Sequence, residues 1–345
     1  TSKYTSWLKA HVSAQAPFSR LPSVLTHLCA GMPSQEVYLL YGKRGWIGQM
    51  LTELLRAQGK TLHLGSVRVE NRESLAAELD RIRPTHVLNA AGVTGTPNVD
   101  WCETHQVETI RSNVVGGLNL ADLCHARGIH MTIFATGCIY EYDDAHHIGG
   151  PGFKEDEKAN FFGSFYSRTK SYLDDMLKSY ADHVLVLRLR MPISDDLSSR
   201  SFITKIVSYE KVIDIPNSMT VLREMLPVSL VMAERRITGT FNFCNPGAIS
   251  HNQCLDLYKE IVDPDYYYSN FSIEEQNKIL KAARSNNELD ATKLVRALPD
   301  IKIDDIHTAM RKVMERMKAG MVSAGEYPHK LPKKDPAKRP PASRL

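Results

Sequence analysis

A tyrosine and a lysine lie four positions apart in the stretch Tyr166-Ser167-Arg168-Thr169-Lys170. Apolar residues at helical spacing predict a helix over Ser164–Tyr180, so the two side chains share one face of it. An ammonium beside a phenol lowers the pKa of the phenol. We therefore expect Tyr166 to exchange a proton with a carbonyl oxygen of a substrate.

Two predicted strands end in residues that suit the same chemistry. The strand Met131–Ala135 runs into Thr136-Gly137-Cys138, and the strand His86–Ala90 runs into Asn89-Ala90-Ala91-Gly92. The carboxyl ends of strands in a doubly wound sheet face the ligand crevice. Thr136 is then placed to hydrogen-bond a substrate carbonyl beside Tyr166. The small residues after the other strand let the backbone approach a cofactor.

A glycine-rich loop joins the predicted strand Val37–Tyr41 to the predicted helix Trp46–Gln58. It reads Gly42-Lys43-Arg44-Gly45-Trp46-Ile47-Gly48. The first glycine permits a sharp turn, the second lets the backbone approach a pyrophosphate, and the third lets the helix pack on the sheet. The free N–H groups of the helix N-terminus would bind the phosphates. The loop predicts a dinucleotide cofactor, whose nicotinamide ribose Lys170 is expected to hold.

Basic residues indicate which nicotinamide the loop takes. Enzymes that use NAD usually carry an acidic residue after the second strand, to hold the ribose 2′-OH. Here the strand Leu62–Leu64 is followed by Gly65-Ser66-Val67-Arg68, without an acid. Lys43, Arg44 and Arg68 could neutralise a 2′-phosphate. The sequence therefore favours NADPH over NADH.

Strands and helices alternate through the first half of the chain, which predicts an α/β fold of the Rossmann type with a doubly wound parallel sheet. A long amphipathic helix is expected over Val107–Arg127 and a further strand over Val184–Arg190. After these the pattern breaks into shorter pieces, which predict a smaller C-terminal substrate-binding lobe interleaved with the last strands. The expected organisation is an N-terminal extension (1–35), an NADP-binding domain (36–190), the substrate lobe (191–326) and a disordered basic tail (327–345).

Composition narrows the class of protein. The formal charge of +4 comes from the two ends, and the body between them is acidic, so a nucleic-acid binder is not expected. No apolar run is long enough to cross a membrane. The six cysteines are scattered without a C-x-x-C pair, which indicates a reduced, cytoplasmic protein with no metal site.

The order of these motifs resembles the extended short-chain dehydrogenase/reductase superfamily. Within it, four longer stretches resemble the nucleotide-rhamnose synthase/epimerase-reductases, over roughly Val37 to Met317. These stretches are Gly92–Glu103, Ala135–Tyr142, Arg190–Ser194 and Arg284–Leu294. The resemblance implies a bifunctional 3,5-epimerase/4-reductase that converts UDP-4-keto-6-deoxy-D-glucose to UDP-L-rhamnose with NADPH.

The resemblance also implies roles for single residues. Cys138 and Lys205 would form the acid–base pair that inverts the centres next to the ketone, while Thr136, Tyr166 and Lys170 would serve the reduction. Further side chains are expected to contact the nucleotide sugar. They are Thr94, Asn98, Asp100, Trp101, Glu103, Arg190, Ser194, Arg284 and Asn287.

Two other functions fit the motifs. One is a monofunctional reductase similar to dTDP-4-dehydrorhamnose reductase, which would need no Cys138–Lys205 pair. The other is a non-catalytic regulatory subunit that binds NADP, against which the intact Thr136, Tyr166 and Lys170 argue. By analogy with the family we expect a homodimer through the helices Val107–Arg127 and Ser164–Tyr180. The preceding 4,6-dehydratase is expected to be supplied separately.

Overall fold

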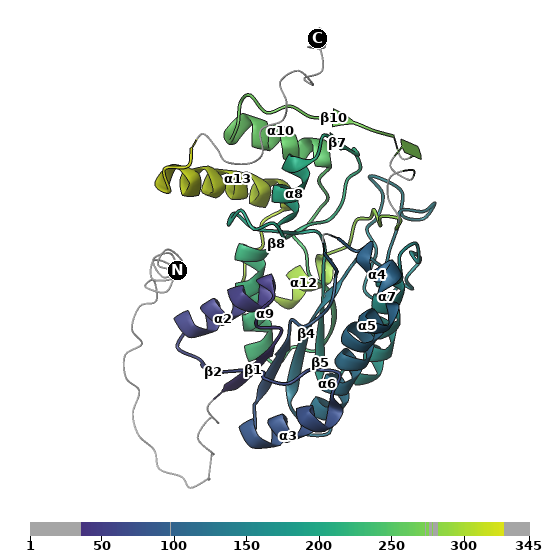
Figure 1. Cartoon of the computed structure of the whole chain (residues 1–345), viewed down its shortest axis with the longest axis vertical. Coiled ribbons are helices and arrows are strands. Elements are labelled where there is room, and N and C mark those ends of the chain that lie inside the picture. Colours follow the sequence, from purple (N-terminus) through teal and green to yellow (C-terminus); the bar gives the residue numbers. More distant parts are fainter. Residues whose placement is uncertain (1–35, 97, 273, 276–277, 279–281, 328–345) are drawn as a thin grey trace.

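A six-stranded parallel sheet forms the lower half of the molecule (Figure 1). The computed structural model describes residues 36–327, apart from 97, 273, 276–277 and 279–281. The strand order is β2-β1-β3-β4-β5-β9, with neighbouring strands parallel throughout. The strands are β1 (Val37–Tyr41), β2 (Thr61–Leu64), β3 (His86–Asn89), β4 (His130–Thr136), β5 (Val184–Leu189) and β9 (Gly239–Asn242). The predicted doubly wound Rossmann-type sheet is confirmed.

Both faces of this sheet are buried, which is why its central strands are almost continuously apolar. Alternate residues point to opposite faces: Tyr38 and Leu40 belong to one core cluster, and Leu39 and Tyr41 to another. Helices α2, α9 and α12 cover the first face, and α3, α6 and α7 cover the second. Their bounds are α2 (Trp46–Ala57), α3 (Arg72–Ile82), α6 (Gly116–His125), α7 (Phe165–Leu177), α9 (Leu222–Glu234) and α12 (Thr292–Ala297).

The long helix expected over Val107–Arg127 is not a uniform α-helix. It consists of α5 (Gln106–Ile110), a π-helical turn η1 (Arg111–Val115) and α6. The short α4 (Trp101–Thr104) precedes it, and the 3₁₀ turn η2 (Lys178–Tyr180) follows α7. The helices α3, α9 and α12 of the sheet layers were not predicted.

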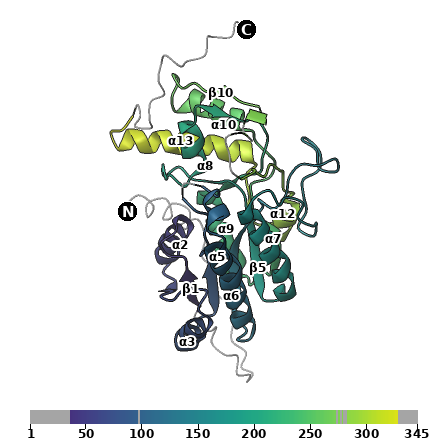
Figure 2. The same ribbon diagram turned by 45° about the vertical axis from the view of Figure 1, so that its right-hand side comes forward.

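A smaller lobe lies above the carboxyl ends of the strands (Figures 1 and 2). Its apolar cluster is separate from those of the sheet and is rich in methionine and isoleucine. It contains α8 (Phe202–Ser208), α10 (His251–Ile261), α13 (Ile306–Ser323) and two small parallel sheets. The sheets pair β6 (Pro192–Ile193) with β8 (Thr220–Val221), and β7 (Lys211–Val212) with β10 (Ser269–Asn270).

The two lobes are interleaved along the chain. The segment that follows residue 190 builds the upper lobe, but it also returns to the lower layers as α9, β9 and α12. Gly239–Asn242 lies within the range expected for the substrate lobe (191–326) and forms β9 of the main sheet, which is the interleaving with the last strands that was expected. The predicted extension (1–35) and nearly all of the predicted tail (328–345) lie outside the described residues. Among the helices that are described, none has the length and apolar character to cross a bilayer.

Candidate active site

The glycine loop after β1 packs directly against the loop after β3. Gly42 has a φ of +86°, and a Cβ there would lie 2.4 Å from the carbonyl carbon of Ala90. A Cβ on Gly48 would lie 2.1 Å from the carbonyl oxygen of Gly42. The tight turn is closed by a hydrogen bond from Gly45 N to Gly42 O of 2.9 Å. Both the sharp turn and the close packing of α2 on the sheet thus require glycine.

The N-terminus of α2 has the features of a phosphate site. Gly45 is the N-cap, no side chain caps the helix, and its first turn contains no acidic residue. The N–H groups there are available to an anion. Arg44 is exposed and Lys43 partly exposed, and Arg68 pairs with Glu70 at 2.7 Å. The loop therefore fits a dinucleotide, and the side chains of Lys43 and Arg44 are free to face its 2′-phosphate.

The predicted catalytic trio converges at the carboxyl end of β4. Thr136 ends that strand, and Tyr166 and Lys170 lie in the first two turns of α7. All three side chains are buried, and the Thr136 hydroxyl is hydrogen-bonded to Tyr166. Lys170 Nζ lies 6.0 Å from the centre of the Tyr166 ring. A Cβ on Gly92 would lie 3.6 Å from the same Nζ, so the Asn89–Gly92 loop meets the trio.

Two caps fix the start of α7 and hence the direction of these side chains. The Ser164 hydroxyl accepts a hydrogen bond from Ser167 N at 3.1 Å. The Glu103 carboxylate accepts one from Phe165 N at 2.7 Å, although Glu103 lies in α4. Caps of this kind satisfy N–H groups that have no partner within the helix. Glu103, predicted to contact substrate, therefore ties the loop after β3 to the catalytic helix.

The ionisation of the trio differs from the expectation. Burial is the main cause that raises the pKa of Tyr166, and the hydrogen bond with Thr136 opposes it. The sequence led us to expect a lowered pKa for this phenol, and the structure corrects that expectation because burial dominates. Burial lowers the pKa of Lys170 to about 8. Tyr166 is a protonated phenol near neutral pH, which suits it to donate a proton.

One residue of this site was missed by sequence reasoning. Asn113 is buried in the π-helical turn η1, and its amide bonds the backbone of the loop after β3. Asn113 Oδ1 accepts from Val93 N at 2.7 Å, and Nδ2 donates to Val93 O at 2.8 Å. Turns of this type are frequent at functional sites. They leave no mark in an apolar periodicity, so this one could not be found from the sequence.

Cys138 follows the same strand end and is the least buried of the cysteines that the structure describes. The others, Cys102, Cys124, Cys244 and Cys254, are buried. Cys138 N donates to the Thr136 hydroxyl at 3.1 Å. Its sulfur accepts a hydrogen bond from Arg190 Nη1 at 2.9 Å. Arg190, expected to contact substrate, is almost fully buried and contacts the thiol instead.

Lys205, the expected partner of Cys138, lies in α8 of the upper lobe. Burial lowers its pKa, and the nearby positive charge of Arg200 adds to this effect. The start of α8 is fixed to β6 by Ser201, whose hydroxyl donates to Ser194 O and accepts from Ser194 N, both at 3.2 Å. Ser194 is itself buried.

The other predicted substrate residues lie on the loop after β3 and on the segment before α12. Asp100 pairs with Arg284 at 2.8 Å, and Trp101 stacks on His105 with ring centres 3.9 Å apart. Asn98 Oδ1 accepts from Asp100 N and shapes the loop. Partly exposed Asp100 and Arg284 thus bring two distant segments together.

Asn287 differs from these residues because none of its surface is exposed. Its Nδ2 donates to the carbonyl oxygens of Gly137 and Tyr140, at 3.1 and 2.8 Å. In this structure the amide holds the loop that carries Cys138, rather than facing open space.

Two residues at the boundary between the lobes were also missed. Asp196 Oδ2 accepts from the indole N–H of Trp46 at 2.8 Å, so it touches the glycine loop. Arg200 donates to Gly95 O at 3.3 Å and to the exposed Thr94 hydroxyl at 3.4 Å. The segment between β6 and α8 therefore contacts both loops that end the strands.

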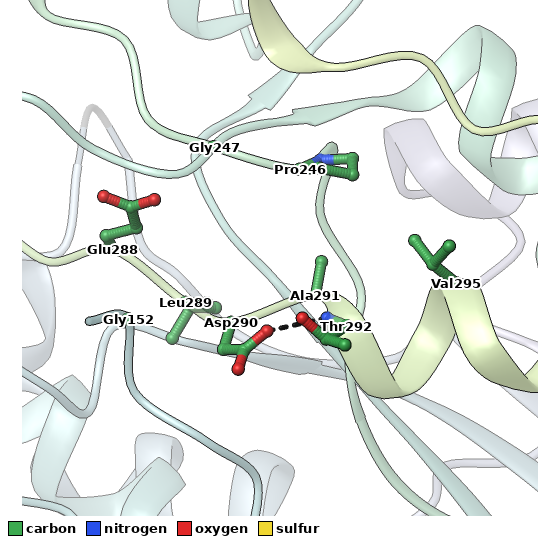
Figure 3. Close-up of a pocket in the computed structure, with 9 residues that line it drawn as sticks. All are labelled: Gly152, Pro246, Gly247, Glu288, Leu289, Asp290, Ala291, Thr292 and Val295. Carbon is green, nitrogen blue, oxygen red and sulfur yellow. Dashed lines mark hydrogen bonds between the residues drawn. The ribbon is translucent and has the colours of Figure 1, made fainter.

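A pocket of about 320 Å³ opens beside this region but contains none of the predicted catalytic residues (Figure 3). It is bordered by Gly152, Pro246, Gly247 and the stretch Glu288–Thr292, with Val295 on α12. Asp290 accepts a hydrogen bond from Thr292 N at 2.8 Å there. The Leu289 side chain lies between this pocket and the carboxyl end of β4. It packs directly on Gly137, where a Cβ would lie 2.5 Å from the leucine.

A group of possible metal ligands lies near the amino-terminal end of β5, at the opposite end of the sheet from the trio. Ligand atoms of His125, Asp182 and His183 lie within 4.8 Å of one another, where α6 ends and β5 begins. No metal site was predicted, and this mostly exposed group is remote from the carboxyl ends of the strands.

The chain was compared with known proteins. Residues 38–216 match the NAD dependent epimerase/dehydratase family. The bifunctional dTDP-4-dehydrorhamnose 3,5-epimerase/dTDP-4-dehydrorhamnose reductase of Arabidopsis thaliana is 55% identical over 266 residues, which cover 76% of this chain and 88% of that protein. A trifunctional UDP-glucose 4,6-dehydratase/UDP-4-keto-6-deoxy-D-glucose 3,5-epimerase/UDP-4-keto-L-rhamnose-reductase of the same plant, RHM2, is equally identical over the same length. The match covers only 40% of RHM2.

Solved structures agree with this relationship. The L780 UDP-rhamnose synthase of Acanthamoeba polyphaga mimivirus is 40% identical, with a TM-score of 0.79 over 82% of this chain and 100% of that chain. The dTDP-4-dehydrorhamnose reductase of Bacillus anthracis, 15% identical, shares the fold with a TM-score of 0.68 over 82% of this chain and 99% of that one. The chain therefore belongs to the NAD dependent epimerase/dehydratase family and is an enzyme of its epimerase/reductase group.

Proposed function

We propose that this enzyme inverts C3 and C5 of UDP-4-keto-6-deoxy-D-glucose and then reduces C4 with NADPH, giving UDP-L-rhamnose. The observation that carries the proposal is the position of Cys138. Its partly exposed thiol lies two residues beyond Thr136, at the strand end where Tyr166 and Lys170 meet. A reductase alone has no use for a thiol there, whereas an epimerase needs a base beside the ketone.

The epimerisation steps follow from the acidity of protons next to a ketone. The Cys138 thiolate takes the proton from C3 or C5, and the electrons of that C–H bond form an enolate whose charge lies on O4. The Lys205 ammonium returns a proton to the opposite face of the same carbon, which inverts it. Burial lowers the pKa of Lys205, which makes this ammonium a better proton donor. Solvent then restores both groups.

The reduction uses the buried trio. Thr136 and Tyr166 hydrogen-bond O4 of the ketone and hold it in place. Tyr166 donates its proton to this oxygen as the C4 centre gains hydride, which NADPH supplies when bound. Lys170 holds the nicotinamide ribose, and the Gly42–Gly48 loop holds the pyrophosphate.

We also propose the form of the cofactor, the nucleotide of the substrate and the source of the ketosugar. The missing acid after β2 and the unpaired Lys43 and Arg44 favour NADPH over NADH. RHM2 and the mimivirus L780 protein are named for UDP-linked sugars, which favours a UDP-linked substrate here. The 4,6-dehydration that makes the ketosugar belongs to another protein, or to chain outside residues 36–327, because that span contains one glycine loop after a strand.

Conversion of UDP-4-keto-6-deoxyglucose in deuterated water tests the function. The enzyme with NADPH is expected to give UDP-rhamnose that carries deuterium at C3 and C5 by NMR. Cys138→Ser should lose that exchange by about 10²-fold or more, because an alcohol is a far weaker base than a thiolate. NADPH oxidation that yields a 6-deoxyhexose without deuterium at C3 and C5 would show that the enzyme is only a reductase. NADPH binding without turnover would show that the protein is a regulatory subunit.

We also propose a homodimer formed by α5 and α7. These helices contact each other and carry exposed apolar residues, namely Val107, Ile110, Tyr172 and Met176. Exposed apolar side chains grouped on adjacent helices are typical of subunit interfaces. Light scattering at micromolar concentration should give twice the mass of 38.8 kDa. A monomer mass that stays unchanged up to millimolar concentration would contradict this arrangement.

A further inference from the structure

Arg190 follows β5 and is almost completely enclosed, with 2% of its surface exposed. Its Nη1 donates to Cys138 Sγ at 2.9 Å, and its Nη2 donates to Asn217 Oδ1 at 2.5 Å and to Ser285 O at 2.6 Å. The guanidinium therefore lies behind the thiol, held from the opposite side by an amide and a backbone carbonyl.

None of these contacts supplies a negative charge to Arg190. Arg188, two positions earlier and equally buried, shows what the same fold does elsewhere. Its Nε and Nη2 donate to the two carboxylate oxygens of Asp174, at 3.0 and 2.6 Å. A buried guanidinium without an anion is costly, because desolvation penalises an unpaired charge. The position of Arg190 therefore calls for an anion other than a carboxylate.

The neighbouring titratable groups do not provide it. Three titratable side chains, Tyr142, Cys244 and His251, lie within electrostatic range of Arg190. Burial raises the pKa of Tyr142 and of Cys244 to about 12 and lowers the pKa of His251 to about 4. All three are neutral near pH 7. Among the three groups to which the Arg190 guanidinium donates hydrogen bonds, the sulfur of Cys138 is the one that can carry a negative charge.

We infer that Arg190 is a positioning residue that holds Cys138 as a thiolate pointed at the sugar. The inference rests on the proposed function and deepens it, because it explains how a cysteine becomes a base in this site. A thiolate beside an arginine is a recognised route to cysteine reactivity. Asn217 and Asn287 complete the support: Asn217 Oδ1 also accepts from Asn287 N at 3.0 Å, and Asn287 holds the Cys138 loop.

The Cys138–Arg190 pair also affects the protonation of Tyr166 and the recovery of the thiolate. While Cys138 is a thiolate, its charge raises the pKa of Tyr166 and keeps the phenol protonated for the later reduction. When the sulfur takes the carbon-bound proton it becomes a neutral thiol, and Arg190 is left without its anion. Loss of that proton to solvent is then favoured, and the base is restored.

Alkylation of Cys138 by iodoacetamide, followed by peptide mass spectrometry between pH 5 and 10, tests the pairing. In the folded wild type the midpoint of reactivity should lie at least one pH unit below that of the same cysteine in the urea-unfolded chain. Arg190→Gln should raise the midpoint by about one unit or more and lower C3/C5 exchange at pH 7 by about tenfold. Arg190→Lys, which keeps a cation, should recover part of both.

A second substrate distinguishes a positioning role of Arg190 from a purely structural one. In Arg190→Gln, the ratio of C3/C5 exchange to reduction of UDP-4-keto-L-rhamnose, which is already epimerised, should fall by about tenfold. Equal midpoints in the folded and unfolded wild type would overturn the inference without any variant, so a failure of Arg190→Gln to fold does not leave it untested. A midpoint of Cys138 alkylation that is the same in a folded Arg190→Gln as in the wild type would also overturn the inference. Absence of C3/C5 exchange in the wild type would instead defeat the proposed function, while the alkylation profile would still report on the pair.

Discussion

Tyr166→Phe is expected to lower the rate of NADPH-dependent reduction by about 10²- to 10⁴-fold while deuterium exchange at C3 and C5 continues. The substitution removes the proton donor at O4 but leaves Cys138 and its contact with Arg190 in place. NADPH oxidation followed by absorbance, and exchange followed by NMR on the same sample, measure the two activities separately. The ketosugar should accumulate in epimerised form.

The matched control for this prediction is Tyr172→Phe in the same helix. Tyr172 is 56% exposed on the proposed dimer face, where phenylalanine keeps the apolar ring and removes only a hydroxyl. Its rates of reduction and exchange should equal those of the wild type. If Tyr166→Phe lost reduction and exchange to the same degree, with a normal thermal transition, Tyr166 would belong to both half-reactions and the assignment of separate groups to them would fail.

Asp174→Asn is expected to destabilise the protein by about 3–5 kcal/mol, because it leaves the buried guanidinium of Arg188 without its anion. Burial opposes the charge on Arg188, but the hydrogen bonds and charge of Asp174 outweigh this and raise the pKa of the arginine. Arg188 also donates to the Tyr140 hydroxyl at 3.0 Å, beneath the loop that carries Cys138. Urea unfolding, followed by circular dichroism, measures the loss.

The neighbouring residue gives the control for that experiment. The side chain of Asp175 is 79% exposed and pairs with Lys178 on the surface of α7 and η2. Asp175→Asn removes the same charge from the same helix, and its free energy of unfolding should change by less than about 1 kcal/mol. A cost for Asp174→Asn no larger than this would show that the Arg188–Asp174 pair contributes little to the fold.

Elements that bury apolar residues with a clear period could be predicted from the sequence. The strands β1 and β4 lie within one residue of their expected bounds, because periodicity reports burial directly. The helix expected over Ser164–Tyr180 is α7 followed by the turn η2, which together cover Phe165–Tyr180. The glycine loop was predictable for a related reason. A positive φ at Gly42 and a backbone contact at Gly48 both exclude a side chain, so the glycines themselves carry the signal.

Features made by distant parts of the chain could not be predicted. Arg190 was expected to face substrate because its sequence position is close to a strand end. Its contact with Cys138 joins residues 52 positions apart and depends on β4 and β5 pairing in one register. The pKa of Tyr166 was misjudged for a similar reason, since burial by the assembled sheet and helices raises it and the local sequence does not report that burial.

The interleaving of the two lobes constrains how the chain can be made and divided. Gly239–Asn242 forms β9 beside β5, although the upper lobe's β6, α8 and β8 are synthesised between them. A nascent chain that has emerged only as far as Leu189 therefore has an unpaired edge on β5, a fully buried strand, and lacks the cover of α9. Exposed strand edges invite pairing with other chains. The dinucleotide half of this enzyme is thus not a detachable module, and its core closes only after most of the upper lobe has left the ribosome.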